Sequence, residues 1–214
     1  MFTGIIQGTG RVVRTSPSTA GGLELTIDVR ELLDPADPAA SFPAYGASIC
    51  VSGCCLTAAR LDPRAGQIGS DVIAETLRCT TLGGLREGSE VNLEASVQPT
   101  TRMDGHIVQG HIEGLGEVLS IETQGQWLAR IRPPAGLMPA IVPKGSIAVE
   151  GVSLTLAAVD VAEGWFEIAL IPTTLELTTL GGLKPGSKVN LETDIMARTA
   201  VHWLAHFGPS APSR

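Results

Sequence analysis

The chain has 214 residues, of which 43% are hydrophobic and 17% are charged, so its apolar content is enough to bury two modest cores. Its net charge is −7 and it has no run of Lys or Arg, which argues against nucleic acid or a membrane surface as a partner. No segment is apolar for long enough to cross a bilayer, and the first residues lack the basic and apolar regions of a signal peptide. We therefore expect a cytoplasmic protein.

Each half of the chain is predicted to form six short strands separated by turn residues. The alternation of Leu23, Leu25 and Ile27 with polar residues is typical of a half-buried strand. The strands expected in the first half are residues 10–14, 23–29, 48–51, 56–61, 69–73 and 90–94. Those expected in the second half are residues 116–121, 127–132, 147–150, 154–159, 165–170 and 188–193. Short helical turns are expected around residues 30–33, 75–82 and 174–180.

One amphipathic helix is predicted at the end of the chain, over residues 195–207. Asp194 can cap its start, and Gly208 with Pro209 stops it. Its apolar stripe consists of Ile195, Met196, Ala200, Trp203, Leu204 and Phe207. Because an isolated helix of this length gains most of its stability from packing, it either covers a barrel end or serves assembly.

Two parts of the chain have nearly the same sequence. Residues 75–94 and 173–192 align without a gap and share Thr-Thr-Leu-Gly-Gly-Leu and Val-Asn-Leu-Glu, and the same offset places residues 53–57 on residues 151–155. Two copies are too few, and each is too long, for a solenoid. We therefore predict an all-β fold of two tandem, homologous, six-stranded antiparallel Greek-key barrels plus a C-terminal α-helix. The expected domains are residues 1–97, 98–194 and the helix 195–207.

The four cysteines, at positions 50, 54, 55 and 79, do not have the spacing of a zinc site. Neighbouring Cys54 and Cys55 point to opposite faces if they lie on a strand. We interpret all four as reduced thiols and expect no metal.

Six short motifs, taken in order, resemble riboflavin synthase of the alpha-chain type over about residues 1–200. They are residues 1–10, the Gly-Cys-Cys-Leu-Thr of 53–57, the Glu-Thr-Leu of 75–77, the Gly-His-Ile-Val-Gln-Gly-His of 105–111, the Gly-Val-Ser-Leu-Thr of 151–155 and the Ile-Pro-Thr-Thr-Leu of 171–175. The resemblance implies a homotrimer that converts two molecules of 6,7-dimethyl-8-ribityllumazine into riboflavin and 5-amino-6-(D-ribitylamino)uracil by four-carbon transfer. It implies no cofactor, and an active site between the first barrel of one subunit and the second barrel of its neighbour. Whether a larger complex with lumazine synthase forms is left open.

This reaction needs a base for the 7-methyl protons of the substrate, hydrogen-bond donors for the resulting anion, and a nucleophile or water that adds to the partner ring. A histidine is the usual base near neutral pH. The resemblance favours His111 as base or proton shuttle with His106 in support, although the pair would otherwise be read as polar residues of an interdomain turn. Cys55 is a candidate nucleophile or else a small buried hydrophobe. Ser153 and Thr155 are its second-half counterparts, and the nucleophile stays open between Cys55, Ser153, another residue and water.

If the two copies bind alike, equivalent segments should contact substrate in each. The expected substrate-binding residues are Gly4, Ile5, Ile6, Ser48, Cys55, Leu56, Thr57, Asp71, Val72, Ile73, Ala74, Glu75, Thr76, Gly110, His111, Ile112, Lys144, Ser153, Leu154, Thr155, Ala169, Leu170, Ile171, Pro172, Thr173 and Thr174.

Three residues depart from the family pattern: Ser52 stands where Asn is frequent, and Glu113 and Glu150 where Asp is usual. The main alternative function is a non-catalytic lumazine- or flavin-binding antenna protein of the same fold. Such proteins lose the paired histidines and the first-pocket cysteine, and His106, His111 and Cys55 are all present here. An unrelated barrel serving as an interaction module is a more distant alternative.

Overall fold

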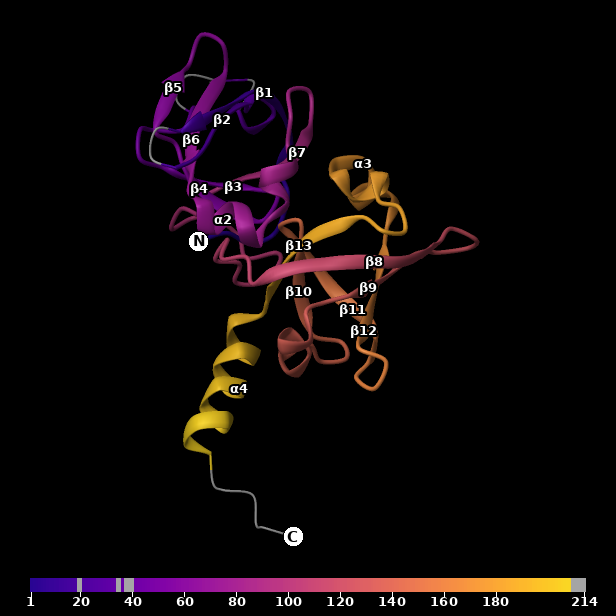
Figure 1. Cartoon of the computed structure of the whole chain (residues 1–214). Coiled ribbons are helices and arrows are strands. Elements are labelled where there is room, and N and C mark those ends of the chain that lie inside the picture. Colours follow the sequence, from indigo (N-terminus) through magenta and orange to yellow (C-terminus); the bar gives the residue numbers. More distant parts are fainter. Residues whose placement is uncertain (19–20, 34–35, 37–40, 209–214) are drawn as a thin grey trace.

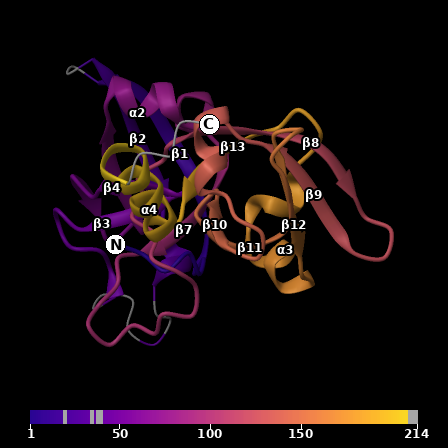
Figure 2. The same cartoon turned by 90° about the horizontal axis from the view of Figure 1, so that it is seen from below.

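The computed structural model describes residues 1–18, 21–33, 36 and 41–208. Two β-sheets, one from each half of the chain, lie side by side, and a C-terminal helix projects from the second (Figure 1). In the view from below, the two halves occupy opposite sides of the molecule (Figure 2). None of the helices in the described ranges is long and apolar enough to span a membrane.

The first half forms a seven-stranded antiparallel sheet in the order β4-β3-β7-β1-β2-β6-β5. Its elements are β1 (Gly8–Ser18), β2 (Gly22–Asp28), the 3-10 helix η1 (Arg30–Leu32), β3 (Ser48–Val51), β4 (Cys54–Thr57), β5 (Arg60–Asp62), β6 (Gln67–Val72), α2 (Ala74–Cys79), η2 (Thr81–Gly84) and β7 (Glu90–Ala95).

The second half forms a closed six-stranded barrel in the order β10-β11-β12-β9-β8-β13. Its elements are β8 (Gly114–Glu122), β9 (Trp127–Arg132), η3 (Ala135–Ala140), β10 (Ser146–Val149), β11 (Val152–Asp160), β12 (Trp165–Leu170), α3 (Pro172–Leu177), η4 (Thr179–Gly182) and β13 (Lys188–Thr193), followed by α4 (Ile195–Phe207).

The predicted all-β fold of two homologous halves with a C-terminal helix is confirmed, but only the second half is a closed six-stranded barrel, whereas the first is a seven-stranded sheet. The strand expected over residues 56–61 belongs to two segments, β4 and β5, which are the two edges of the first sheet. The amides of Ala58 and Ala59 between them donate to Ala47 (2.9 Å) and Gly69 (2.8 Å), so the chain turns from one neighbouring strand to the other at this point. In the second half the equivalent β11 is continuous and carries only a register shift between Leu156 and Ala158.

Each half has its own apolar core, and a small third cluster lies between them. This central cluster consists of Phe2, Cys50, Val108 and Ala148, all almost fully buried. Phe2 and Val108 also form an isolated antiparallel bridge, with amide-to-carbonyl distances of 2.7 and 3.1 Å. The chain segments that precede β1 and β8 therefore meet at the centre of the molecule.

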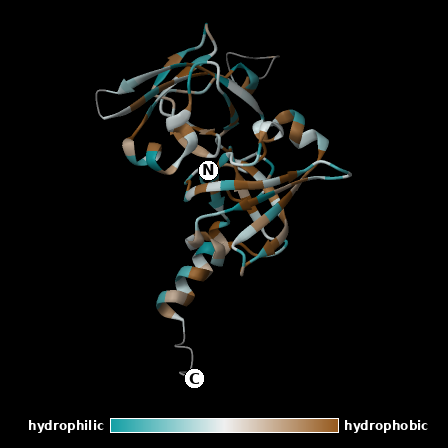
Figure 3. Cartoon of the chain, turned by 45° about the vertical axis from the view of Figure 1, so that its right-hand side comes forward, coloured by the Kyte–Doolittle hydropathy of each residue, from teal (hydrophilic) through white to brown (hydrophobic). Residues whose placement is uncertain are grey.

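Helix α4 has the predicted bounds, and its start is capped because the Asp194 carboxylate accepts the amide of Met196 (2.9 Å). None of its residues is buried, and Met196, Leu204 and Phe207 are 71%, 63% and 68% exposed. Figure 3 shows hydrophobic positions recurring along this projecting helix. Its apolar stripe therefore does not cover a barrel end within this chain. Pro209, expected to end the helix, lies outside the described residues.

Candidate functional site

Two pockets occupy equivalent places in the two halves. The first pocket, of about 220 Å³, is lined by Cys54, Cys55, Glu75, Thr76, Cys79, Thr80, Gly110, His111 and Ile112. The second pocket, of about 210 Å³, is lined by Gly4, Ile5, Ile6, Val152, Ser153, Ile171, Thr173, Thr174, Leu177 and Thr178. In the first half the pocket is lined by residues of β4 and α2, and in the second half by residues of the equivalent elements β11 and α3.

Each pocket is completed by a segment from the other half of the chain. The amide of Cys55 donates to the carbonyl oxygen of Gly110 (2.9 Å), and the amide of Ser153 donates to that of Gly4 (2.7 Å). Gly4 and Gly110 have φ values of 77° and 79°, and a Cβ on either would lie 2.6 Å from the Cβ of Ser153 or Cys55. Glycine is therefore required at both positions, by its left-handed backbone and by the close approach of the facing strand.

A buried glutamate from the last strand of each sheet holds one of these two segments in place. We call them the exchanged segments: residues 3–4, which complete the second pocket, and residues 109–111, which complete the first. Glu94 accepts the amides of Thr3 (2.7 Å) and Gly4 (2.9 Å), while Glu192 accepts the amides of residues 109–111 at 2.6–2.9 Å. Burial raises the pKa of both carboxyls, and the amide hydrogen bonds oppose that rise. The repeated Val-Asn-Leu-Glu motif ends on these two residues, but the sequence alone did not assign them a role.

Ser153, which lines the second pocket, is paired with a histidine behind it. Nδ1 of His106 lies 2.7 Å from Oγ of Ser153, and Nε2 of His106 is buried without a hydrogen-bond partner among the described residues. Burial lowers the pKa of His106. Burial thus favours the neutral imidazole, which in its Nε2–H tautomer can accept the proton of the Ser153 hydroxyl at Nδ1.

The first pocket instead contains His111, which is exposed, and two half-buried thiols, Cys55 and Cys79. Cys54 also borders the pocket but belongs to the core, and burial raises the pKa of its thiol to about 12. Cys50 is fully buried with a pKa well above the ordinary value for the same reason. Cys54 and Cys50 are therefore poor nucleophiles, which leaves Cys55 as the strand thiol available to a ligand.

About half of the predicted binding residues line the two pockets, and His106 contacts the second through Ser153. The predicted residues outside both pockets are Ser48, Leu56, Thr57, Asp71, Val72, Ile73, Ala74, Lys144, Leu154, Thr155, Ala169, Leu170 and Pro172. Strand alternation accounts for several of them, because Leu56 and Leu154 turn into the cores and the threonine after each is exposed. Asp71 is paired with Arg60 (3.1 Å).

Six pocket residues were not identified from the sequence as part of a site: Cys54, Cys79 and Thr80 in the first pocket, and Val152, Leu177 and Thr178 in the second. The last two in each pocket lie one helical turn after Glu75–Thr76 and Thr173–Thr174, so extending the expected contacts by one turn of α2 and α3 identifies them. Among the described residues, no group of three or more His, Cys, Asp or Glu side chains is arranged to hold a metal ion.

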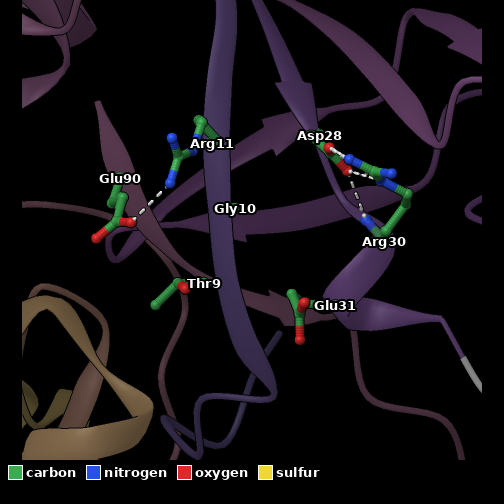
Figure 4. A pocket seen from close by; sticks show the side chains of 7 residues that line it. All are labelled: Thr9, Gly10, Arg11, Asp28, Arg30, Glu31 and Glu90. Carbon is green, nitrogen blue, oxygen red and sulfur yellow. Dashed lines mark hydrogen bonds and ion pairs between the residues drawn. The ribbon is translucent and has the colours of Figure 1, made fainter. Parts of the chain in front are cut away.

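A separate charged pocket of about 430 Å³ lies along β1 and η1, away from the predicted catalytic residues (Figure 4). Its arginines are already paired: Arg11 with Glu90 (3.2 Å) and Arg30 with Asp28. Because these pairs neutralise each other, the pocket has no free cationic group for an anionic ligand.

Comparison with known proteins gives consistent results. The model of the lumazine binding domain family matches residues 3–96 and 109–194. A riboflavin synthase of Mycobacterium bovis is 42% identical over 200 residues, covering 92% of this chain and 95% of that protein. The crystal structure of LumP complexed with riboflavin aligns with a TM-score of 0.75 at 29% identity, and LumP complexed with 6,7-dimethyl-8-(1'-D-ribityl) lumazine aligns at 0.74 and 27%. Each LumP alignment covers 90% of this chain and 99% of the LumP chain.

Proposed function

The chain belongs to the lumazine-binding-domain family that includes the riboflavin synthases, which are transferases, and we propose that it carries out their dismutation reaction. Two molecules of 6,7-dimethyl-8-ribityllumazine would exchange a four-carbon unit and give riboflavin and 5-amino-6-(D-ribitylamino)uracil. The observation that carries this proposal is the presence of two equivalent pockets with unequal reactive groups. A reaction between two copies of one substrate, in which one copy gives and the other receives, needs that arrangement.

We further propose that the reacting pair forms between subunits of a homotrimer, with the first pocket of one subunit facing the second pocket of its neighbour. Each pocket is open, and at 210–220 Å³ it is smaller than the roughly 300 Å³ at which ligand pockets begin. A neighbouring subunit that covers both would supply the missing walls and exclude water. The exposed apolar stripe of α4 is the proposed contact between subunits. A cytoplasmic location and a complex with lumazine synthase remain predictions.

The proposed mechanism assigns different tasks to the two pockets. His111 removes a 7-methyl proton from the substrate in the first pocket, and the backbone amides of the uncapped first turn of α2, which lines this pocket, stabilise the delocalised anion. In the second pocket His106 accepts the Ser153 proton as Oγ adds to the other ring, if Ser153 rather than Cys55 or water is the nucleophile. Holding the two rings face to face provides much of the rate, because it makes a bimolecular step effectively unimolecular.

A direct test is to incubate the purified protein with 6,7-dimethyl-8-ribityllumazine and to follow riboflavin formation by absorbance. We expect one riboflavin for every two lumazines consumed. The likeness to LumP favours a second candidate, a lumazine- or flavin-binding protein without turnover. Fluorescence of bound lumazine with no riboflavin formed would support that candidate and contradict the enzymatic proposal.

A further inference from the structure

A buried acidic cluster lies where the two halves of the chain meet. Oε1 of Glu150 accepts the amide of Asn190 (2.6 Å), and the hydroxyls of Ser52 and Thr81 lie near this carboxyl. Glu150 is 8% exposed, and burial raises the pKa of its carboxyl to about 7. No ion pair to Glu150 is formed within the described part of the chain.

This cluster is connected directly to the wall of the first pocket. The amide of Thr81 donates to Oδ1 of Asn190 (2.8 Å), and Nδ2 of Asn190 donates to Oγ1 of Thr81 (2.8 Å) and to the carbonyl oxygen of Ser52 (2.8 Å). Thr81 begins η2 two residues after α2 ends, and α2 and Thr80 form one side of the first pocket. The position of α2 therefore depends on how Thr81 is held against the second half.

The second pocket has the same connection without the acid. The amide of Thr179, which begins η4 after α3, donates to Oδ1 of Asn92 (2.8 Å). Nδ2 of Asn92 donates to the carbonyl oxygen of Glu150 (2.9 Å), and its backbone amide donates to Oγ of Ser52 (3.3 Å). Ser52 thus occupies the place that Glu150 has in the other half. One pocket helix is held through an ionisable group and the other through a hydroxyl.

We propose that Glu150 is a positioning residue for the first pocket: its neutral carboxyl holds Asn190, and through Asn190 also Thr81 and α2, in place, and its ionised carboxylate loosens them. Helix α3 is connected to the backbone carbonyl of Glu150 and not to its carboxyl, so it responds less. The proposal deepens the proposed function, on which it rests for the identity of the first pocket as a substrate site. It makes the binding geometry of the substrate in the first pocket depend on pH in the neutral range more strongly than that of the substrate in the second pocket.

The direction follows from solvation. A carboxylate without a cationic partner is stabilised by water, so ionisation favours opening of the cluster. When opening is linked to the loss of one proton, the open fraction rises by up to about tenfold for each pH unit between the pKa of the carboxyl in the open cluster and its pKa in the closed cluster, and it levels off above the latter.

The elements around this region carry further titratable groups. They are Cys50 on β3, Glu94 on β7, Glu192 on β13, and Glu75, Arg78 and Cys79 on α2. Glu94 and Glu192 are engaged by the backbone amides of the exchanged segments, and Glu75 pairs with Arg78 at the surface. Because burial also raises the pKa of Glu94 and Glu192, the test must separate their effect from that of Glu150.

Hydrogen exchange measured by mass spectrometry on the full chain, without ligand, tests the proposal. Peptides covering residues 74–84 report on α2 and η2, and peptides covering residues 172–182 provide an internal control. After correction for the intrinsic pH dependence, we expect protection of residues 74–84 to fall roughly tenfold between pH 6 and pH 8, with little change at residues 172–182. Glu150→Gln keeps a hydrogen-bond acceptor without the charge and should abolish the difference.

Two outcomes overturn the proposal: an equal response of both helices in the unmodified protein, or a pH response that persists in Glu150→Gln. If that variant does not fold, Thr81→Val replaces it, with Thr179→Val as the matched control in the other half. Thr81→Val should remove the pH response of α2, and Thr179→Val should leave it intact. The hydrogen-exchange measurement does not need turnover. Failure of the protein to make riboflavin would contradict the proposed function, whereas the hydrogen-exchange result would still decide the role of Glu150.

Discussion

At the scale of single residues, His106 and His111 are five positions apart but serve different pockets. The sequence predicted that they act together, because nothing in their spacing indicates which way each side chain turns. The bridge between Val108 and Phe2 and the left-handed backbone of Gly110 lie between them and separate their directions. Within one chain, His106 adjoins Ser153 and His111 adjoins the thiols, so the two meet only if the pockets of different subunits face each other.

Replacement of His111 tests its role as base. We expect His111→Ala to lower turnover by a factor of about 10²–10⁴ while the dissociation constant for 6,7-dimethyl-8-ribityllumazine changes little, because a base acts in the transition state. Steady-state kinetics and fluorescence titration measure the two quantities. His202→Ala, an exposed histidine outside both pockets, serves as control. Equal losses of turnover and binding would argue against a base.

The buried Glu150 predicts how stability depends on pH. Its pKa is raised to about 7 in the folded state from an ordinary value of 4.5, so the folded state binds the proton more tightly. The associated stabilisation is fully present below pH 4.5 and is lost as the pH rises toward 7, for a total of roughly 3 kcal/mol. Urea unfolding at several pH values should show this decline in the free energy of unfolding.

Glu150→Gln should flatten that decline, leaving only the part in the same direction that comes from Glu94 and Glu192. An unchanged pH dependence in the variant would show that Glu150 is ionised in the folded state throughout this range.

At the scale of elements, the strand pattern, the duplication and the bounds of α4 could be predicted because each is written in local periodicity and turn residues. The strands over residues 48–51, 127–132, 165–170 and 188–193 have the predicted bounds. The division of the expected strand 56–61 into two strands could not be predicted, because it depends on which backbone carbonyls accept the amides of Ala58 and Ala59. The exchange of the Gly4 and Gly110 segments was also beyond the sequence, because it pairs backbone groups far apart in the chain.

Helix α4 provides a test of assembly. Leu204→Glu places a carboxylate on the exposed apolar stripe, and burying it unpaired at a subunit contact costs several kcal/mol. We expect the subunit dissociation constant to rise about 100-fold or more, measured by analytical ultracentrifugation. Ala205→Glu, exposed on the opposite side of the helix, is the matched control and should leave the mass unchanged. A trimer of unaltered stability in Leu204→Glu would exclude the stripe as the contact.

At the scale of the whole molecule, the proposed site belongs to two subunits, which complementation can test. His111→Ala damages the first pocket and Ser153→Ala the second. When the two variants are unfolded, mixed in equal amounts and refolded together, random assembly should leave about a quarter of the intersubunit sites intact. Riboflavin formation should then recover to that fraction of normal. No recovery in verified mixed trimers would place the site within one chain.

The hydrogen bonds that join the Gly4 and Gly110 segments to the opposite halves of the chain also bear on how the duplicated fold arose. In this chain the wall that completes each pocket comes from the other copy of the repeated segment. A single copy with the same contacts would complete its pocket by pairing with a second molecule, and a tandem duplication supplies that second copy within one chain. Cleavage of the chain between its two halves should accordingly give two fragments that bind each other.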